Sequence, residues 1–246
     1  MLIDRRSFVG GSAALALTGC ATIPDRSAGC SPLPPVLVDE ARVIRTVAGL
    51  RPYRSAGFVV RRDTLGDKAL VHNYGHGGAG ITLSWGSSRL AVDLGLAGHS
   101  GPVAVIGSGV MGLTTARLCQ EAGFPVAIYT AALPPDTTSA VAGGQVSPFG
   151  HYREGEVTPQ WMAQFQAAMA YSWQRTYEET RDRVIESDWM DPYYPNARLL
   201  SAAEHPFPVD RVMAFDTMYV ETPRFMAQLT SEVLNAGGAI RMRRFE

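Results

Sequence analysis

The sequence of 246 residues predicts an α/β protein with a parallel sheet. Three observations support this prediction. A short β-branched run at residues 103–106 carries no charge, as expected of a buried parallel strand. A glycine-rich turn with a helical pattern follows directly, and a second uncharged run occupies residues 126–129. Strand, helix and strand in this order form the unit from which parallel sheets are built.

Composition excludes several classes of protein. Hydrophobic residues make up 46% of the chain, which is enough for one large domain or two small ones with a sizeable core. The net charge of -1 excludes a general nucleic-acid binder, which would carry a basic excess. Glycine and proline are scattered, so the chain is not disordered. Three cysteines (Cys20, Cys30 and Cys119) are too few and too far apart for a disulfide scaffold or a metal cluster.

Residues 1–20 have the layout of a bacterial export signal. Arg5 and Arg6 precede an uncharged stretch at 9–19, which is shorter than the roughly 20 residues of a transmembrane helix. A paired arginine before a short apolar region is typical of the twin-arginine route. The Leu-Thr-Gly-Cys run ending at Cys20 resembles a lipobox, so we expect a periplasmic protein or a lipoprotein anchored through Cys20. Residues 21–35 would be the linker; the alternative is an N-terminal helix that frays.

The turn at residues 107–112 has the pattern Gly-x-Gly-x-x-Gly. Gly107 permits a tight turn, Gly109 lets backbone N–H groups approach a pyrophosphate, and Gly112 lets the helix pack on the strand. The pattern lies between a strand and a helix, which is the context that dinucleotide binding requires. We therefore expect a Rossmann-type domain in which the pyrophosphate is bound by Gly107, Ser108, Gly109, Val110, Met111 and Gly112. The alternative is a glycine-rich turn without a ligand.

The end of the second strand departs from the usual dinucleotide pattern. An Asp or Glu normally holds the adenosine ribose there, whereas this strand ends in Tyr-Thr-Ala-Ala at residues 129–132. The ribose must then be held by backbone groups or hydroxyls. A nicotinamide cofactor, which depends heavily on that carboxylate, is disfavoured.

The most specific run of the chain is Val-His-Asn-Tyr-Gly-His-Gly-Gly-Ala-Gly-Ile-Thr-Leu-Ser-Trp-Gly at residues 71–86. Its four glycines within six residues indicate that the backbone must approach something closely. An amphipathic helix follows from Ile81 to about Leu94, and its N-terminus can stabilise negative charge. Continued to residue 88, the run resembles the signature of the D-amino-acid oxidase family at every defining position but the last. There Ser88 stands in place of the usual alanine. The resemblance implies FAD, with the flavin ring held by Gly77, Gly78, Ala79, Gly80, Ile81 and Thr82.

Two more stretches resemble the same family. Residues 49–54 are similar to the segment that carries the substrate-carboxylate arginine, which implies that role for Arg51; the alternative is a surface charge. An arginine suits a planar carboxylate because its fork donates two parallel hydrogen bonds. The resemblance also implies that the Gly78 carbonyl receives the substrate amine. Residues 136–144 resemble the flavin loop, which implies that the flavin side chain and phosphate are held by Thr137, Thr138, Ser139, Gly143 and Gly144.

Other residues invite a chemical role less strongly. His72 and His76 could suggest a metal or an acid/base pair, but no carboxylate motif accompanies them, so a structural or cofactor-lining role is favoured. No metal site is expected. Cys119 is expected to be a buried apolar residue.

The C-terminal half predicts two more helices and a strand. A helix is expected from Thr158 to about Arg183, with a stripe at Trp161, Phe165, Met169, Trp173 and Tyr177 that favours core packing over a cofactor role. A second helix is expected to begin at Thr222 as N-cap with Pro223 at its first position, and to end at Asn235 before two glycines. A strand follows at residues 239–244.

The order of these segments is unusual for the family. The glycine-rich signature normally lies near the C-terminus, whereas here it precedes the Rossmann strand across a short loop at 97–102. We therefore expect a circular permutation, with a substrate-arginine strand and the flavin-binding glycine-rich segment with its helix at 36–102, and an incomplete FAD-binding domain at 103–246. By resemblance, the strand at 239–244 should be followed by the third segment of the Rossmann sheet and by most of the antiparallel substrate domain. The chain thus resembles a fragment or a shortened relative.

The resemblance implies FAD-dependent oxidative deamination of D-amino acids. A hydride passes from the substrate Cα to flavin N5, the imine hydrolyses to a 2-oxo acid and ammonia, and O₂ reoxidises the flavin to H₂O₂. The implied partners are a small amino acid and O₂, with no nucleic acid; the oligomeric state stays open. Two alternatives remain at this stage: an oxidase of glycine or sarcosine on the same fold, and a truncated flavoprotein without activity.

Overall fold

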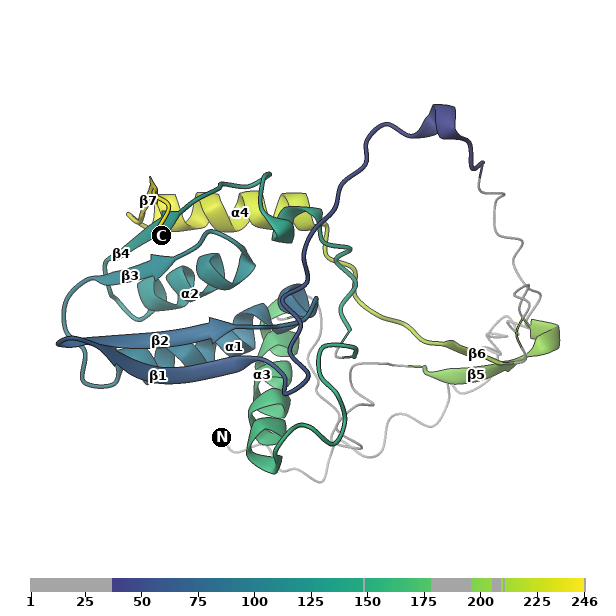
Figure 1. Ribbon diagram of the computed structural model, residues 1–246, viewed down its shortest axis with the longest axis horizontal. Helices are drawn as coiled ribbons and strands as arrows, with labels where there is room; N and C mark the ends of the chain where they lie inside the picture. Colours follow the sequence, from purple (N-terminus) through teal and green to yellow (C-terminus); the bar gives the residue numbers. More distant parts are fainter. Residues whose placement is uncertain (1–36, 148, 178–195, 205–208, 210, 246) are drawn as a thin grey trace, which may run out of the picture. The chain divides into compact units, whose positions relative to one another are not determined.

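The computed structural model describes residues 37–147, 149–177, 196–204, 209 and 211–245 (Figure 1). The predicted export signal and linker at residues 1–35 lie outside this part of the chain. The described residues fall into two units. The larger unit comprises residues 38–198 and 213–246, and all the candidate site residues belong to it.

The larger unit contains a three-stranded parallel sheet in the order β3-β4-β7. Its strands are β3 (Val103–Ile106), β4 (Val126–Thr130) and β7 (Ala239–Met242). Val105 pairs with Ile128, which pairs with Ile240. The prediction of an α/β fold on a parallel sheet is confirmed. The expectation that the third strand follows residues 239–244 is wrong, because β7 itself is the third strand.

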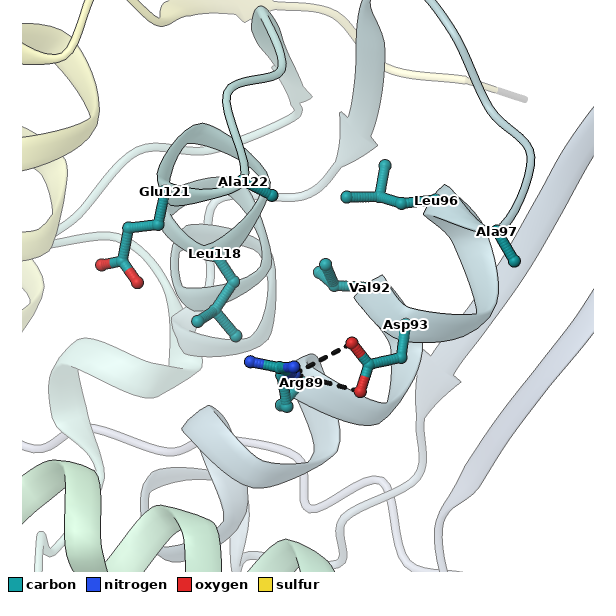
Figure 2. Close-up of a pocket in the computed structure, with 8 residues that line it drawn as sticks. All are labelled: Arg89, Val92, Asp93, Leu96, Ala97, Leu118, Glu121 and Ala122. Atoms are coloured by element: carbon teal, nitrogen blue, oxygen red, sulfur yellow. Dashed lines mark hydrogen bonds and ion pairs between the residues drawn. The ribbon is translucent and has the colours of Figure 1, made fainter.

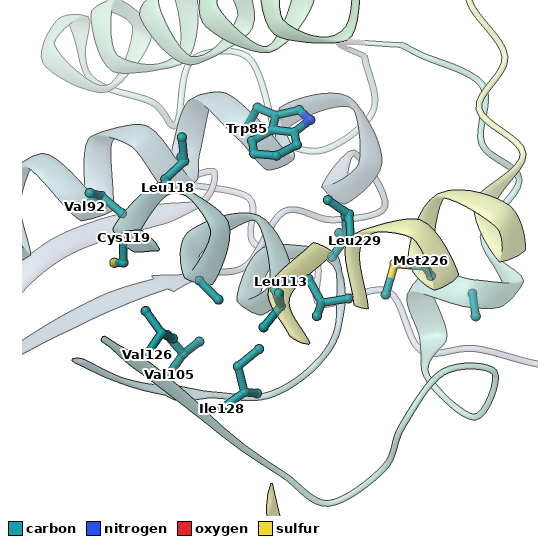
Figure 3. Close-up of a cluster of buried hydrophobic side chains, with 14 residues drawn as sticks. Trp85, Val92, Val105, Leu113, Leu118, Cys119, Val126, Ile128, Met226 and Leu229 are labelled. Carbon is teal, nitrogen blue, oxygen red and sulfur yellow. The ribbon is translucent and has the colours of Figure 1, made fainter. Parts of the chain in front are cut away.

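Helices α2 (Val110–Glu121) and α4 (Thr222–Asn235) pack on this sheet and on each other. Leu113 of α2, Ile128 of β4 and Leu229 of α4 are almost completely buried in one core, which Figure 3 shows. Along α4 the buried residues recur every three or four positions, at Thr222, Met226, Leu229 and Val233, as a buried helix face requires. The core holds β3, α2 and β4 in the arrangement that dinucleotide binding needs.

An antiparallel hairpin leads into the glycine-rich signature. Strand β1 (Val59–Leu65) pairs with β2 (Lys68–Tyr74), so that Val59 lies opposite Tyr74. Gly66 makes the connecting turn with a φ of +62°. Strand β2 ends just before the glycine-rich segment, from which α1 (Gly80–Leu96) begins. A separate two-stranded sheet is formed by β5 (Arg198–Ser201) and β6 (Arg211–Ala214).

Helix α3 (Pro159–Tyr177) packs across α1. The crossing is so close that a Cβ at Gly86 would overlap the Ala168 carbonyl. Phe165 and Met169 are completely buried, Trp161 is nearly so, and Trp173 packs against the same core while partly buried, which confirms the core role for these four members of the predicted stripe. The side chain of Tyr177 lies outside the described part of the chain. The predicted extension of this helix to Arg183 lies outside the described residues. No transmembrane span is found among the helices of the described ranges.

The predicted role of Thr222 is wrong. Thr222 is the first residue of α4 rather than its N-cap, and Pro223 is the second. The Thr222 hydroxyl instead donates hydrogen bonds to the carbonyls of Ala140 and Ala142, at 3.2 and 2.9 Å. These carbonyls belong to the segment that includes the short helix η2 (Thr138–Val141), so Thr222 anchors the predicted flavin loop to α4.

Candidate functional site

The glycine-rich turn after β3 has the conformation that the sequence predicts. Gly107 has a φ of +100°, in the region that favours glycine, and its missing Cβ faces open space. A Cβ at Gly112 would overlap the Gly107 carbonyl and lie 3.5 Å from Val105 Cγ1, so only glycine lets α2 start this close to β3. Helix α2 begins at Val110, whose N–H donates to Ser139 Oγ at 3.0 Å.

Thr130, at the end of β4, stabilises this turn through hydrogen bonds. Its buried hydroxyl accepts a hydrogen bond from the Ser108 N–H at 3.2 Å and donates to the Ala132 carbonyl at 2.7 Å. The Ser108 hydroxyl also donates to the Ala132 carbonyl, at 2.7 Å. Sequence reasoning missed this role. The one sequence signal for it is that Thr130 lies next to the position where the usual ribose carboxylate is absent.

A hollow of about 390 Å³ lies at the carboxyl ends of β3, β4 and β7. Its volume is in the range of small-ligand sites. Thr137 Oγ1 is buried and has no hydrogen-bond partner among the described residues, so a polar ligand in this hollow would satisfy it. The hollow is lined by Ile106, Gly107, Ser108, Gly109, Tyr129, Thr130, Ala131, Ala132, Thr137, Arg243, Arg244 and Phe245.

The N-termini of α1 and α2 lie beside each other. A Cβ at Gly80, the first residue of α1, would be 3.7 Å from Val110 Cγ1. Ser88, buried on α1, connects the two helices: its hydroxyl lies 2.8 Å from Thr114 Oγ1 and donates to the Met111 carbonyl at 3.2 Å. The positive ends of two helix dipoles therefore meet in one place, which favours an anionic ligand between them.

Arg51 lies in an irregular segment ahead of β1, so the predicted strand for this arginine is wrong, and its side chain lies against the backbone of the glycine-rich signature. Gly77 and Gly78 have φ values of +58° and +100°, which bulky residues rarely adopt. The Gly77 N–H donates to the Pro52 carbonyl at 3.2 Å. A Cβ at Gly78 would be 3.1 Å from Cδ, Cζ and Nε of Arg51, so the guanidinium lies against an exposed Gly78.

The predicted flavin loop contacts both neighbouring segments. A Cβ at Gly49, two residues before Arg51, would lie 3.0 Å from Thr138 Cγ2. Thr82, the third residue of α1, accepts a hydrogen bond from the Ser147 N–H at 3.0 Å. Thus the arginine segment, the loop and both helix N-termini form one region.

Gly143 and Gly144 are placed differently from the rest of the predicted loop. A Cβ at Gly144 would overlap the Val220 carbonyl, so close packing against the segment just before α4 explains this glycine. Gly143 is exposed and has open space beside it.

The two histidines of the signature differ in environment. His76 is almost completely buried, stacks on Phe58 at 5.1 Å, and its Nε2 lies 3.0 Å from Ser87 Oγ. Burial, reinforced by the nearby His151, lowers the pKa of His76 to about 3, so its ring is neutral at physiological pH. His72 is partly exposed, 3.9 Å from Asp63.

Burial also raises the pKa of the Cys119 thiol to about 11, consistent with the predicted buried apolar role of this residue.

A second hollow, of about 330 Å³, lies at the C-terminal ends of α1 and α2 (Figure 2). There Arg89 donates from Nε to both carboxylate oxygens of Asp93, at 2.9 and 3.0 Å. None of the predicted site residues lines this hollow. The candidate site is therefore the region at the N-terminal ends of the same two helices.

A Rossmann-type sheet with two convergent glycine-rich helix N-termini defines a dinucleotide-binding protein. A family model described as "DAO: FAD dependent oxidoreductase" matches residues 26–94 and 102–244. The chain belongs to this family, whose cofactor is FAD. The residues present fit that cofactor, because the hollow, the open face of Gly107 and the unsatisfied Thr137 hydroxyl lie at the predicted pyrophosphate site.

Curated relatives match a short part of the chain. A D-amino-acid oxidase of Streptomyces coelicolor is 48% identical over 66 residues, which cover 26% of this chain and 20% of the relative. A D-amino-acid oxidase of Rubrobacter xylanophilus is 48% identical over 65 residues, with the same coverage. A D-aspartate oxidase of Cryptococcus neoformans is 40% identical over 57 residues, which cover 22% of this chain and 14% of the relative. The chain thus matches about a fifth of the length of the first two.

Proposed function

We propose that this FAD-dependent oxidoreductase oxidatively deaminates D-amino acids. The observation that carries the proposal is the position of the Arg51 guanidinium against Gly78, next to the N-terminus of α1. This arrangement offers a cation for a carboxylate and a backbone carbonyl for an amine within one small region. The names of the curated relatives support the same substrate class.

Each residue would have a defined task. Arg51 would bind the substrate carboxylate through its paired N–H donors. The carbonyl of Gly78, an exposed residue, would accept a hydrogen bond from the substrate amine, which orients the Cα–H bond. When bound, FAD supplies the two-electron acceptor. The positive ends of α1 and α2 would stabilise the negative charge that the cofactor carries.

The site requires no side chain as general base. A substrate amine that is deprotonated when bound retains its lone pair and can release a hydride from Cα. His76, the nearest histidine in the signature, is buried against Phe58 and Ser87 and stays neutral. Its task would be to support the glycine-rich turn.

We also propose that the order of segments reflects a circular permutation. The family model matches two separate stretches, and the first contains Arg51 and the glycine-rich signature. Contacts between Ser88 and Thr114 and between Thr82 and Ser147 join the two stretches around one region. The export signal at residues 1–20, with Cys20 as lipid anchor, is likewise a proposal, which fractionation of the producing cell would test.

Anaerobic reduction of the bound flavin tests the proposed reaction. The full chain, loaded with FAD under nitrogen, should lose its visible flavin absorbance when D-alanine is added. L-alanine and sarcosine should leave the spectrum unchanged. Bleaching by sarcosine but not by D-alanine would assign the chain to the secondary amines instead, and no bleaching by any of them would contradict an oxidase.

A further inference from the structure

The nucleotide end of the site is cationic. The residues that line the larger hollow include Arg243 and Arg244 and no aspartate or glutamate. A dinucleotide site built for a plain adenosine ribose has a carboxylate at the end of the second strand, whereas an arginine nearby accommodates a phosphate on that ribose. The charge of this lining therefore corresponds to the second case.

The backbone fixes one of these arginines beside the end of β4. The Arg243 N–H donates to the Thr130 carbonyl at 2.7 Å, which continues the pairing of β4 with β7 by one residue. The Arg243 guanidinium lies over the Phe245 ring, 5.1 Å from its centroid. Arg241 does not line the hollow. Its guanidinium donates instead to the Tyr129 hydroxyl at 3.2 Å.

The side chains at the end of β4 offer no carboxylate to an unmodified ribose. Ala131 and Ala132 carry only methyl groups, and the Thr130 hydroxyl already bonds to Ser108 and to the Ala132 carbonyl. A guanidinium donates hydrogen bonds but accepts none. It pairs best with a doubly accepting anion such as a phosphate monoester.

We propose that this end of the site binds adenine nucleotides that carry a phosphate on the ribose, through Arg243 and Arg244, in competition with FAD. The ribose phosphate is at the 2′ position in NADP⁺ and at the 3′ position in coenzyme A. The ribose of FAD has neither. Occupancy of the chain by FAD would then fall when such nucleotides are abundant. The inference concerns the nucleotide site alone and is independent of which amine the chain oxidises.

Isothermal titration of the full chain without FAD tests this with two matched pairs of ligands. NADP⁺ is compared with NAD⁺, and coenzyme A with its 3′-dephospho form, at constant ionic strength. We expect the phosphorylated member of at least one pair to bind about tenfold tighter or more, as a charge-assisted hydrogen bond provides. The pair that shows the advantage identifies the 2′ or the 3′ position. An advantage below tenfold in both pairs would overturn the proposal.

Two variants and a competition experiment locate the effect. Arg243→Gln with Arg244→Gln should abolish the advantage. The control, Arg61→Gln with Arg224→Gln, removes two exposed arginines that pair with Asp63 and Glu221 and should retain it. Saturation with FAD should prevent the phosphorylated nucleotide from binding. Survival of the advantage in the first variant, or undiminished binding in the presence of FAD, would contradict the assignment. FAD absorbance and circular dichroism of each variant report cofactor binding and folding separately.

Discussion

The guanidinium of Arg51 lies against the backbone of Gly78, so closely that a Cβ at Gly78 would stand 3.1 Å from Cζ and Nε of the arginine. The two residues come from separate segments, one ahead of β1 and one after β2. The β1–β2 hairpin brings these two segments side by side, because Val59 at the start of β1 pairs with Tyr74 at the end of β2. A cation and the exposed residue Gly78 thereby lie next to the start of α1, and this relationship carries the proposed substrate site.

Arg51→Ala should weaken the binding of carboxylate substrates. A hydrogen-bonded charge pair contributes about 1.5–3 kcal/mol, so the Michaelis constant for D-alanine should rise by roughly tenfold to a hundredfold. Steady-state oxygen consumption measures it. Arg61→Ala on β1, which removes an exposed arginine beside Asp63, is the matched control and should leave the constant unchanged. The same Michaelis constant for both variants would show that Arg51 does not bind the substrate carboxylate.

Gly78→Ala should displace the arginine without removing it. The new Cβ would contact three Arg51 atoms at 3.1 Å, and the φ of +100° adds backbone strain on the order of 1–3 kcal/mol. We expect impaired substrate binding together with a lower free energy of unfolding. Gly66→Ala has a φ of +62° and no atom near its Cβ, so it should lower stability but leave the Michaelis constant intact. If both variants keep normal substrate binding, Gly78 does not control the arginine.

Gly112→Ala should abolish FAD binding. Its Cβ would overlap the Gly107 carbonyl, which forces α2 away from the pyrophosphate turn. The yield of flavin absorbance per chain after reconstitution is the measurement. Gly95→Ala is the control, because it also changes a helical glycine but meets only a Val71 methyl at 3.3 Å. Normal flavin content in Gly112→Ala would show that the turn does not hold the cofactor.

Ser88→Ala should loosen the contact between α1 and α2. The buried Ser88 hydroxyl bonds to Met111, Thr114 and Thr115, and its removal leaves buried polar groups unsatisfied. We expect a loss of about 1–3 kcal/mol in the free energy of unfolding, measured by urea denaturation. Ser231→Ala on the exposed face of α4 should change it by less than about 0.5 kcal/mol. A Ser88 variant as stable as the wild type would mean that alanine serves equally well here.

Acid should destabilise the fold through His76. Its pKa is about 3 in the folded chain and near 6.5 when exposed, so between these values protons bind the unfolded chain preferentially. The contribution of His76 is therefore complete above pH 6.5 and is lost as the pH falls towards 3, with a slope approaching about 1.4 kcal/mol per pH unit.

Replacement of His76 isolates this contribution. His76→Gln should show a flatter decline of unfolding free energy between pH 7 and 4.5 than the wild type, measured by urea denaturation at each pH. His72→Gln makes the same chemical change at a partly exposed position and serves as the control. Parallel pH curves for His76→Gln and the wild type would contradict this account.

The elements of the Rossmann unit could be predicted because their signals are local. The uncharged run at 103–106 and the spacing of Gly107, Gly109 and Gly112 depend only on neighbouring residues. The observed helix α2 and the overlap that Gly112 avoids match those signals. The same is true of the aromatic stripe of α3, whose period specifies a buried face.

Roles that depend on distant partners could not be predicted. Thr222 has the sequence context of an N-cap, but its hydroxyl binds the carbonyls of Ala140 and Ala142, which lie about eighty positions earlier. Thr130 bonds to Ser108 from the neighbouring strand, and no local rule assigns a threonine there. A strand at 239–244 could be predicted, and the structure has it at 239–242, but its place beside β4 is set by the sheet as a whole.

The central claim is that the N-termini of α1 and α2 act on a single FAD. Comparison of FAD with ADP by isothermal titration of the full chain tests it most directly, because ADP reaches only the α2 side. One FAD should bind per chain, with an affinity about a hundredfold or more higher than that of ADP. The reason is that the flavin half adds contacts at α1 within a molecule that is already bound, so no further translational and rotational entropy is lost. An FAD affinity within twofold of the ADP affinity would show that α1 takes no part in the site.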